Sequence, residues 1–157
     1  MEQIDEGLAA YRTTGATLLR PYFLALAAEA HTRGNRRGEA LRLLREALTE
    51  VDRSGERWFE AELHRLAGEL LRSDQIQAES CFRRAIEVAS KQGAKTWELR
   101  AVTSLSRLWH EQERRAEALT MLSPIYGWFT EGLNTADLRD ARALLNELGR
   151  TPPSAIA

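Results

Sequence analysis

Residues Glu56 to Gly93 spell ERWFEAELHRLAGELLRSDQIQAESCFRRAIEVASKQG, a stretch typical of two antiparallel helices joined by a short polar turn. Apolar residues recur at helical spacing on both sides of the turn at residues 73–75. Connections this short force consecutive helices to pack antiparallel. The rest of the chain contains weaker copies of this stretch, so the sequence predicts an array of helix pairs.

A regular spacing of glycines sets the length of the repeated unit. Gly15, Gly55, Gly93 and Gly132 each follow a helical pattern, at spacings of 40, 38 and 39 residues. Self-similarity at a fixed period of roughly 20–50 residues indicates a solenoid, whose units bury their apolar faces only by stacking. We therefore predict an all-α, right-handed superhelical solenoid of antiparallel helix pairs with a period of about 39 residues.

The same glycines divide the chain into parts. One helical repeat domain is expected over residues 1–149, followed by a disordered tail at 150–157. Within the domain the sequence predicts a half-repeat (1–15), three repeats (16–55, 56–93 and 94–132) and a capping helix (133–149). Helices are expected at residues 2–14, 17–33, 37–53, 57–72, 76–91, 96–112, 115–130 and 135–148, with a kink at Pro124.

Composition excludes several classes of function. The chain has 157 residues, 22 of them basic and 23 acidic and well mixed, so it offers no basic field for nucleic acid. Cys81 is the only cysteine, which excludes an internal disulfide and favours a reducing, cytoplasmic setting. No apolar run approaches the roughly 20 residues that span a bilayer, and the N-terminal MEQIDEG lacks the apolar segment of a signal peptide.

Each unit carries the same apolar pattern: a bulky residue, then Leu and a small residue, and later Ala, a large apolar residue and Ala again. The positions are Phe23, Leu26, Ala27, Ala40, Leu44 and Ala47; then Leu63, Leu66, Ala67, Ala78, Phe82 and Ala85; then Val102, Leu105, Ser106, Ala118, Leu122 and Ile125. This pattern resembles the tetratricopeptide repeat, in which small residues let two helices approach closely. That family has a period of about 34 residues, so the longer unit here resembles the variant found in signalling ATPases of the maltose-regulator type. Ser106, Glu113 and Ile125 depart from the family pattern.

Longer strings extend the resemblance over nearly the whole chain. The segments AELHRLAGELL, AESCFRRAIEVA, RAVTSLSRLW and SPIYGWFTEGLNTADLRDARALLNEL resemble the C-terminal repeat region of bacterial multidomain proteins. Those proteins carry a class III nucleotidyl cyclase or a DNA-binding region, then an ATPase module, then helical repeats. No GxxxxGK[ST] motif occurs in this chain, so it has no phosphate-binding loop. Helix one, expected at residues 2–14, resembles the second helix of a repeat whose first helix is missing. Met1 is therefore expected to begin either a fragment or a short open reading frame derived from a longer parent.

A concave groove along the first helix of each pair is the candidate binding site, because these positions face away from the second helix when the units are superposed. The residues are Leu24, His31, His64, Gly68, Arg72, Arg100, Thr103, Arg107 and His110. Three arginines and three histidines in this set favour an acidic peptide or an anionic ligand over an apolar helix. The histidines lie too far apart for a metal site, so neither a metal nor a cofactor is expected.

Other polar and aromatic residues have structural interpretations. Glu60, Glu62, Glu69, Glu79, Glu87 and Glu98 are spaced for helical ion pairs with Arg65, Arg72, Arg83 and Arg84, on a solvated face, and not for acid–base catalysis. Arg36, Arg37, Arg114 and Arg115 are expected to pair with Glu39 and Glu117. Trp58, Trp97, Trp109 and Trp128 are expected to pack between units. Because no nucleophile and base adjoin, we expect no catalytic activity.

These observations predict a non-enzymatic protein-interaction or regulatory scaffold with a protein or peptide partner, and with neither nucleic acid nor membrane as partner. The resemblance implies the C-terminal region of a cytoplasmic cyclase- or transcription-regulator-linked ATPase, whose own ATPase module is then one candidate partner. Two alternatives stay open: a small-molecule inducer-binding sensor of the same regulator type, and a purely structural oligomerisation element. Because helix one lacks a preceding helix, Ile4, Leu8 and Tyr11 should be under-covered, which favours a homodimer through the N-terminal half-repeat.

Overall fold

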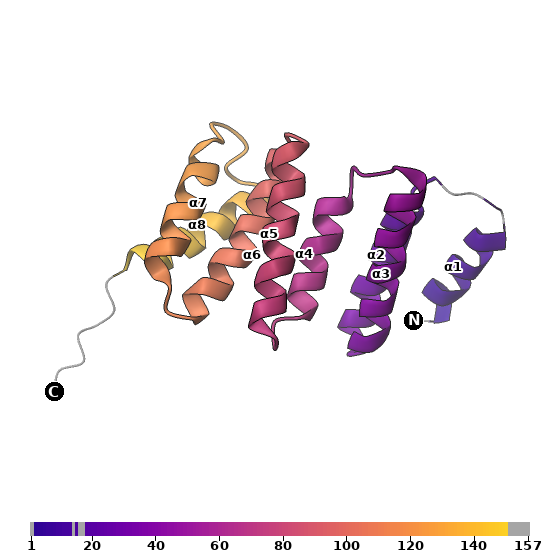
Figure 1. Ribbon diagram of the computed structural model, residues 1–157. Coiled ribbons are helices and arrows are strands. Elements are labelled where there is room, and N and C mark those ends of the chain that lie inside the picture. The colour runs from indigo at the N-terminus through magenta and orange to yellow at the C-terminus, as the bar shows by residue number, and fades with distance from the viewer. Residues whose placement is uncertain (1, 14, 16–17, 151–157) are drawn as a thin grey trace.

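The chain folds into helices throughout the part that the structure, a computed structural model, describes: residues 2–13, 15 and 18–150. The elements are α1 (Glu2–Thr13), α2 (Arg20–Arg33), α3 (Arg37–Ser54), α4 (Glu60–Leu70), α5 (Gln75–Lys91), α6 (Lys95–Glu111), α7 (Arg115–Gly127) and α8 (Ala136–Gly149) (Figure 1). No strand occurs among these residues, so the predicted all-helical fold is confirmed. Apart from Arg150, the predicted tail lies outside the described residues.

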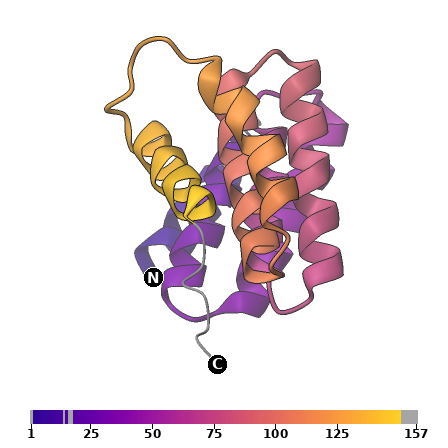
Figure 2. The ribbon, with the colours of Figure 1, turned by 90° about the vertical axis from the view of Figure 1, so that its left-hand side faces the viewer.

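Three antiparallel pairs form the body of the molecule: α2 with α3, α4 with α5, and α6 with α7. The helices α2, α4, α6 and α8 also contact one another in succession and form one layer, which we call the inner layer. In contrast, α3 and α5 do not contact each other, and neither do α5 and α7: in each of these described pairs, all Cα atoms of the two helices are more than 8 Å apart. Figure 2 views the array from its C-terminal end, with α8 beside α7. The closer spacing of the inner layer makes it the narrower face of the array.

Hydrogen bonds between residues that are 35 and 39 positions apart in the chain tie neighbouring pairs together. Arg72, two residues after the end of α4, donates to Glu111 of α6 at 2.6 Å, 39 residues further along the chain. Gln92 donates to the carbonyl oxygen of Arg57 at 2.7 Å, across 35 residues. These bonds connect equivalent places in successive pairs.

The glycines that set the predicted period close the turns. Gly15, Gly55, Gly93 and Gly132 have φ of 70°, 77°, 65° and 67°, a left-handed conformation that glycine adopts without steric cost. At Gly55 the amide also donates to Val51 O at 2.9 Å and ends α3. The next turn contains Asp74, whose carboxylate accepts from the amide of Gln77 at 3.1 Å and starts α5.

Three predicted helices are shorter in the structure. α2 begins at Arg20, after a turn at Leu18 and Leu19, whereas the sequence predicts a helix from residue 17. α4 begins at Glu60 and not at residue 57, because Trp58 and Phe59 lie in a turn where their rings pack together. α7 ends at Gly127, three residues after Pro124, whereas the sequence predicts a helix to residue 130. The chain then crosses to α8 in an irregular segment.

The apolar core has two main parts. One lies among α2, α3 and α4 around Leu24 and Leu63, and the other among α5, α6, α7 and α8 around Phe82 and Leu105. All four side chains are fully buried. Among the described residues, no helix combines the length and the apolar character that crossing a bilayer requires.

Candidate functional site

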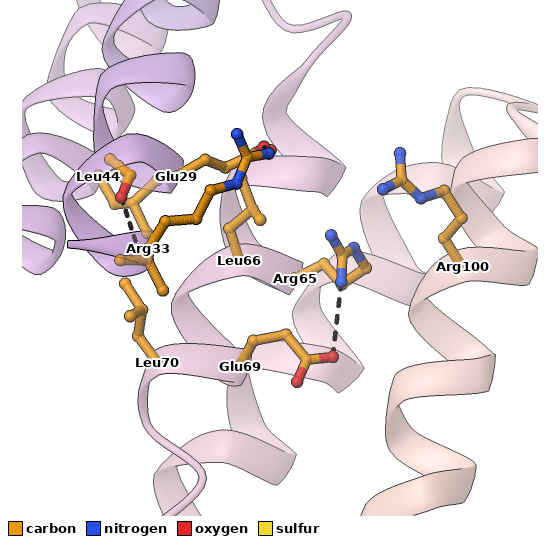
Figure 3. A pocket seen from close by; sticks show the side chains of 10 residues that line it. Glu29, Arg33, Leu44, Arg65, Leu66, Glu69, Leu70 and Arg100 are labelled. Carbon is orange, nitrogen blue, oxygen red and sulfur yellow. Dashed lines mark hydrogen bonds and ion pairs between the residues drawn. The ribbon is translucent and has the colours of Figure 1, made fainter. Parts of the chain in front are cut away.

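A hollow of about 300 Å³ opens on the inner layer between α2, α4 and α6 (Figure 3). Its apolar lining comes from Ala28, Leu44, Leu66 and Leu70, and its polar lining from Glu29, Thr32, Arg33, Arg65, Glu69 and Arg100. The stacking of α2 on α4 and of α4 on α6 brings these residues together from units far apart in sequence. The hollow is therefore a product of the array and of no single helix pair.

Arg65 forms the polar centre of this face. Its guanidinium donates to both oxygens of Glu62 at 2.8 Å and lies 3.5 Å from Glu69, and only 13% of its side chain is exposed. Burial lowers the pKa of Arg65, but the hydrogen bond and charge of Glu62 outweigh burial and raise the pKa overall. Ser104 of α6 donates to Glu69 at 2.6 Å, so the network joins α4 to α6.

A second, smaller hollow of about 100 Å³ lies between α4, α6 and α8, and its lining is mostly polar. Arg100 bridges it, with its guanidinium 2.9 Å from Glu62 and 3.6 Å from Asp137 of α8. Arg107, two helical turns further along α6, lies 2.5 Å from Asp140. The acidic side of α8 thus faces the arginines of α6.

Every arginine described on this face has a carboxylate beside it. Arg72 contacts both Glu69 at 3.1 Å and Glu111 at 2.6 Å. Arg33 is the most exposed of them, with 81% of its side chain accessible, and it lies 3.6 Å from Glu29. The inner layer is therefore rich in charge but carries no unbalanced positive field.

The structure brings four of the nine predicted groove residues to this face. Arg100, Thr103 and Arg107 line the smaller hollow, and Arg72 lies at the rim between α4 and α6. The Thr103 hydroxyl is buried and donates to Leu99 O at 2.8 Å, so its one donor is used within its own helix.

The other five predicted residues lie elsewhere, which corrects the assignment. Leu24 is fully buried and His31 is 2% exposed, so neither reaches the surface. Gly68 faces α5, because a Cβ on it would lie 2.5 Å from the Phe82 ring. His64 lies on the side of α4 where Arg84 of α5 acts on it, and His110 is half-buried near the end of α6.

The physical reason for the error is helix geometry. Successive residues on an α-helix point about 100° apart, so a register error of one or two residues exchanges faces. His64 and Gly68 share the face toward α5, whereas Glu62, Arg65 and Glu69 share the inner face. The sequence did contain a signal for the missed residues, namely the predicted Glu–Arg pairs on α4. Glu62, however, is 2% exposed and so does not lie on a solvated face.

Burial also changes the titration of His64. Burial lowers its pKa below the ordinary value of 6.5, more strongly than the nearby Glu60 carboxylate raises it. Among the described residues, no three His, Cys, Asp or Glu side chains lie together as metal ligands require. Cys81 is half-buried, and burial raises the pKa of its thiol, which disfavours the reactive thiolate.

The predicted arginine pairs hold only in part. Arg114 contacts Glu117 at 2.7 Å as expected, and also Glu79 at 2.9 Å. Glu39 contacts Arg42 instead of the preceding arginines, because Arg42 lies one turn along the same helix. Arg115 donates to the carbonyl oxygens of Glu147 and Leu148, and Arg37 donates to Ser73, so both cap or bridge helix ends.

The four tryptophans divide into two classes. Trp109 is 3% exposed and donates to Glu79 at 3.0 Å, and Trp97 packs against Phe59 with 5.3 Å between ring centroids. Trp58 and Trp128 are 46% and 58% exposed, so packing between units accounts for only part of their surface.

A scan against protein-family models finds no match to this chain, and a search of curated proteins finds no significant relative.

Proposed function

We propose that this chain is a non-enzymatic interaction module, built as a solenoid of tetratricopeptide-like units, that binds a protein or peptide segment on its inner layer. The observation that carries the proposal is the 300 Å³ hollow between α2, α4 and α6, with apolar side chains at its base and paired charges at its rim. Interfaces of this kind combine an apolar centre with a polar border. Its composition suits one apolar side chain of a bound segment, flanked by polar groups.

The likeness to cyclase- and regulator-linked ATPases gives this module a setting. There the partner would be a segment of the parent protein's ATPase module, with the repeats acting as a regulatory scaffold. Finding an ATPase motif encoded in the same reading frame upstream of Met1 would support this setting. A reading frame that starts at Met1 without such a motif would leave the binding proposal in place but remove the ATPase as partner.

Selection from a displayed peptide library tests the binding proposal directly. Thr32 is exposed and lines the hollow, so Thr32→Trp fills it without entering the core. Thr49 on α3 is the matched control, since its hydroxyl makes the same bond to the carbonyl four residues back, away from the hollow. Peptides selected on the wild type should bind the Thr49→Trp variant equally well and the Thr32→Trp variant at least about tenfold more weakly. Equal binding to all three proteins would remove the inner layer as the site.

A small-molecule sensor is the second candidate, because about 300 Å³ equals the lower end of the ligand-pocket range of roughly 300–1,000 Å³. A ligand that binds the folded chain raises its melting temperature once its concentration exceeds the Kd. A thermal-shift screen that finds such a ligand, together with loss of the shift in Thr32→Trp, favours the sensor over the peptide module.

A further inference from the structure

The exposed apolar side chains of this chain gather at one edge. The start of α2 and the connections α3–α4, α5–α6 and α7–α8 all lie at the upper edge in Figure 1, and the other connections between paired helices lie at the lower edge. Five of the seven large apolar residues that are exposed in the described part lie just before α2 or in these upper connections: Leu18, Leu19, Trp58, Trp128 and Leu133. We call this set the aromatic edge.

The opposite edge differs in character. Its turns are Gly34-Asn35-Arg36, Leu71-Arg72-Ser73-Asp74 and Gln112-Glu113-Arg114. Leu71 is the one large apolar residue in them, and it is half-buried against the core. Ile76, at the start of α5, is the one strongly exposed apolar residue described there. The apolar character of the upper edge is therefore a property of that edge and not of turns in general.

Contacts between neighbouring connections link parts of the aromatic edge, in part through Phe59, which is only 6% exposed. The amide of Leu19 donates to the Glu56 carboxylate at 3.1 Å, which holds the start of α2 against the α3–α4 connection. Ring centroids of Tyr22 and Trp58 are 5.7 Å apart. From Phe59 the row passes to Trp97 at 5.3 Å, and Lys95 lies 6.0 Å from the ring of Trp128.

The basic side chains at this edge already form ion pairs with carboxylates of the same chain. Arg57 lies 3.0 Å from Asp52, Lys91 lies 2.6 Å from Glu87, and Lys95 lies 2.7 Å from Glu98. An anionic lipid surface is recognised by an excess of basic side chains, which this edge does not present. A nearly neutral apolar strip instead allows two identical strips to meet without repulsion.

We propose that a second copy of this chain docks on the aromatic edge in a two-fold dimer. The exposed parts of Trp58 and Trp128 amount to about 200 Å². The exposed parts of Leu18, Leu19 and Leu133 equal about one and a half leucine side chains and add roughly 150 Å². Two copies thus supply about 700 Å² of apolar surface, close to the 56–65% apolar share of a specific interface of about 1,200 Å².

This surface differs from the one predicted from sequence. Leu8 and Tyr11 of α1 are half-buried, with the Tyr11 ring 5.1 Å from that of Phe23 on α2. A hollow of about 410 Å³ remains beside them, so the N-terminal half-repeat is the competing interface. The proposal does not depend on the inner layer binding a partner.

Sedimentation equilibrium over a concentration series up to about 1 mM tests the dimer, since weak specific association is visible there. Leu18→Glu and Trp128→Glu change opposite ends of the edge at side chains that are 69% and 58% exposed, so the fold should persist by circular dichroism. Each should raise the dimer Kd at least about tenfold. Ile76→Glu on the opposite edge and Leu8→Glu on α1 should leave the Kd unchanged.

Three results would overturn the proposal. A wild-type chain that stays monomeric throughout the series removes self-association altogether. Dissociation by Leu8→Glu alone assigns the dimer to the N-terminal half-repeat. An equal effect of Ile76→Glu and Trp128→Glu shows that added charge, and not this edge, decides association.

Discussion

Replacing Gly68 by alanine tests what sets the distance between α4 and α5. A Cβ on Gly68 would lie 2.5 Å from Cε1, 2.7 Å from Cδ1 and 3.0 Å from Cζ of Phe82. Real Cβ contacts essentially never fall below 3.0 Å. Phe82 is itself fully buried, so its ring cannot move aside without disturbing the core. Either the ring leaves its preferred rotamer or the two helices move apart.

Two effects of opposite sign determine the change in free energy of unfolding. Alanine in a helix interior is more favourable than glycine by about 0.5–1 kcal/mol. Overpacking a well-packed core costs about 1–3 kcal/mol. Since Gly68 meets a rigid aromatic ring and not the end of a flexible side chain, we expect packing to outweigh helix propensity. The Gly68→Ala variant should lose about 0.5–2 kcal/mol, which lowers the melting temperature by about 1–8 °C for a chain of this size.

Urea unfolding of the variant, two controls and the wild type provides the measurement. At Gly38, near the start of α3, a Cβ would meet no neighbouring atom within 4 Å, so Gly38→Ala should be neutral or stabilising by up to about 1 kcal/mol. In the Gly68→Ala/Phe82→Leu double variant the smaller side chain relieves the clash. Its loss should be smaller than the sum of the two single losses by about 1 kcal/mol. If Gly68→Ala is as stable as the wild type with an unchanged urea slope, the close approach of α4 to α5 does not depend on this glycine.

Three further predictions concern stability, measured by urea unfolding or by thermal unfolding. Glu62→Ala leaves Arg65 and Arg100 without their buried partner and should cost about 3–5 kcal/mol; a loss below about 1 kcal/mol would show that this network is not a stabilising feature. Because burial foremost lowers the folded pKa of His64 below 6.5, its contribution to stability is present above pH 6.5 and is lost as the pH falls through the folded pKa. In the His64→Gln variant, the melting temperature should therefore depend less on pH below pH 6.5 than it does in the wild type. The same pH dependence in both proteins would contradict this. Ala85→Trp, at a fully buried position, should cost more than about 3 kcal/mol, whereas a wild-type melting temperature would refute the helix pairing.

The helices and their order were predictable because the sequence marks their ends. Gly55 and Gly93 adopt the left-handed conformation that ends a helix, and Asp74 caps the next one. Propensity and turn chemistry are local, so one sequence suffices to identify them. Trp58 and Phe59 show the limit of this approach, since their apolar character suggested helix while their ring contacts hold them in a turn.

The faces of the helices were harder to predict than their positions. On α4, polar and apolar residues alternate so closely that His64 and Arg65 suit the inner face equally well by composition. Arg65 lies on the inner face because its partner Glu62 is buried there. The Glu62 carboxylate forms ion pairs with Arg65 on the same helix and with Arg100 on the next inner helix. A contact across units cannot be deduced from the spacing within one helix.

The pairing of charges on the inner layer constrains what can bind there. An acidic peptide, expected from the arginines in the sequence, would have to replace Asp137 at Arg100 or Asp140 at Arg107. Each replacement exchanges one carboxylate for another and so adds little affinity. The apolar base of the 300 Å³ hollow requires no such exchange, because an apolar side chain entering it removes surface from water without breaking an ion pair. A partner of this face should therefore gain affinity from an apolar anchor, with the exposed Arg33 contributing to orientation.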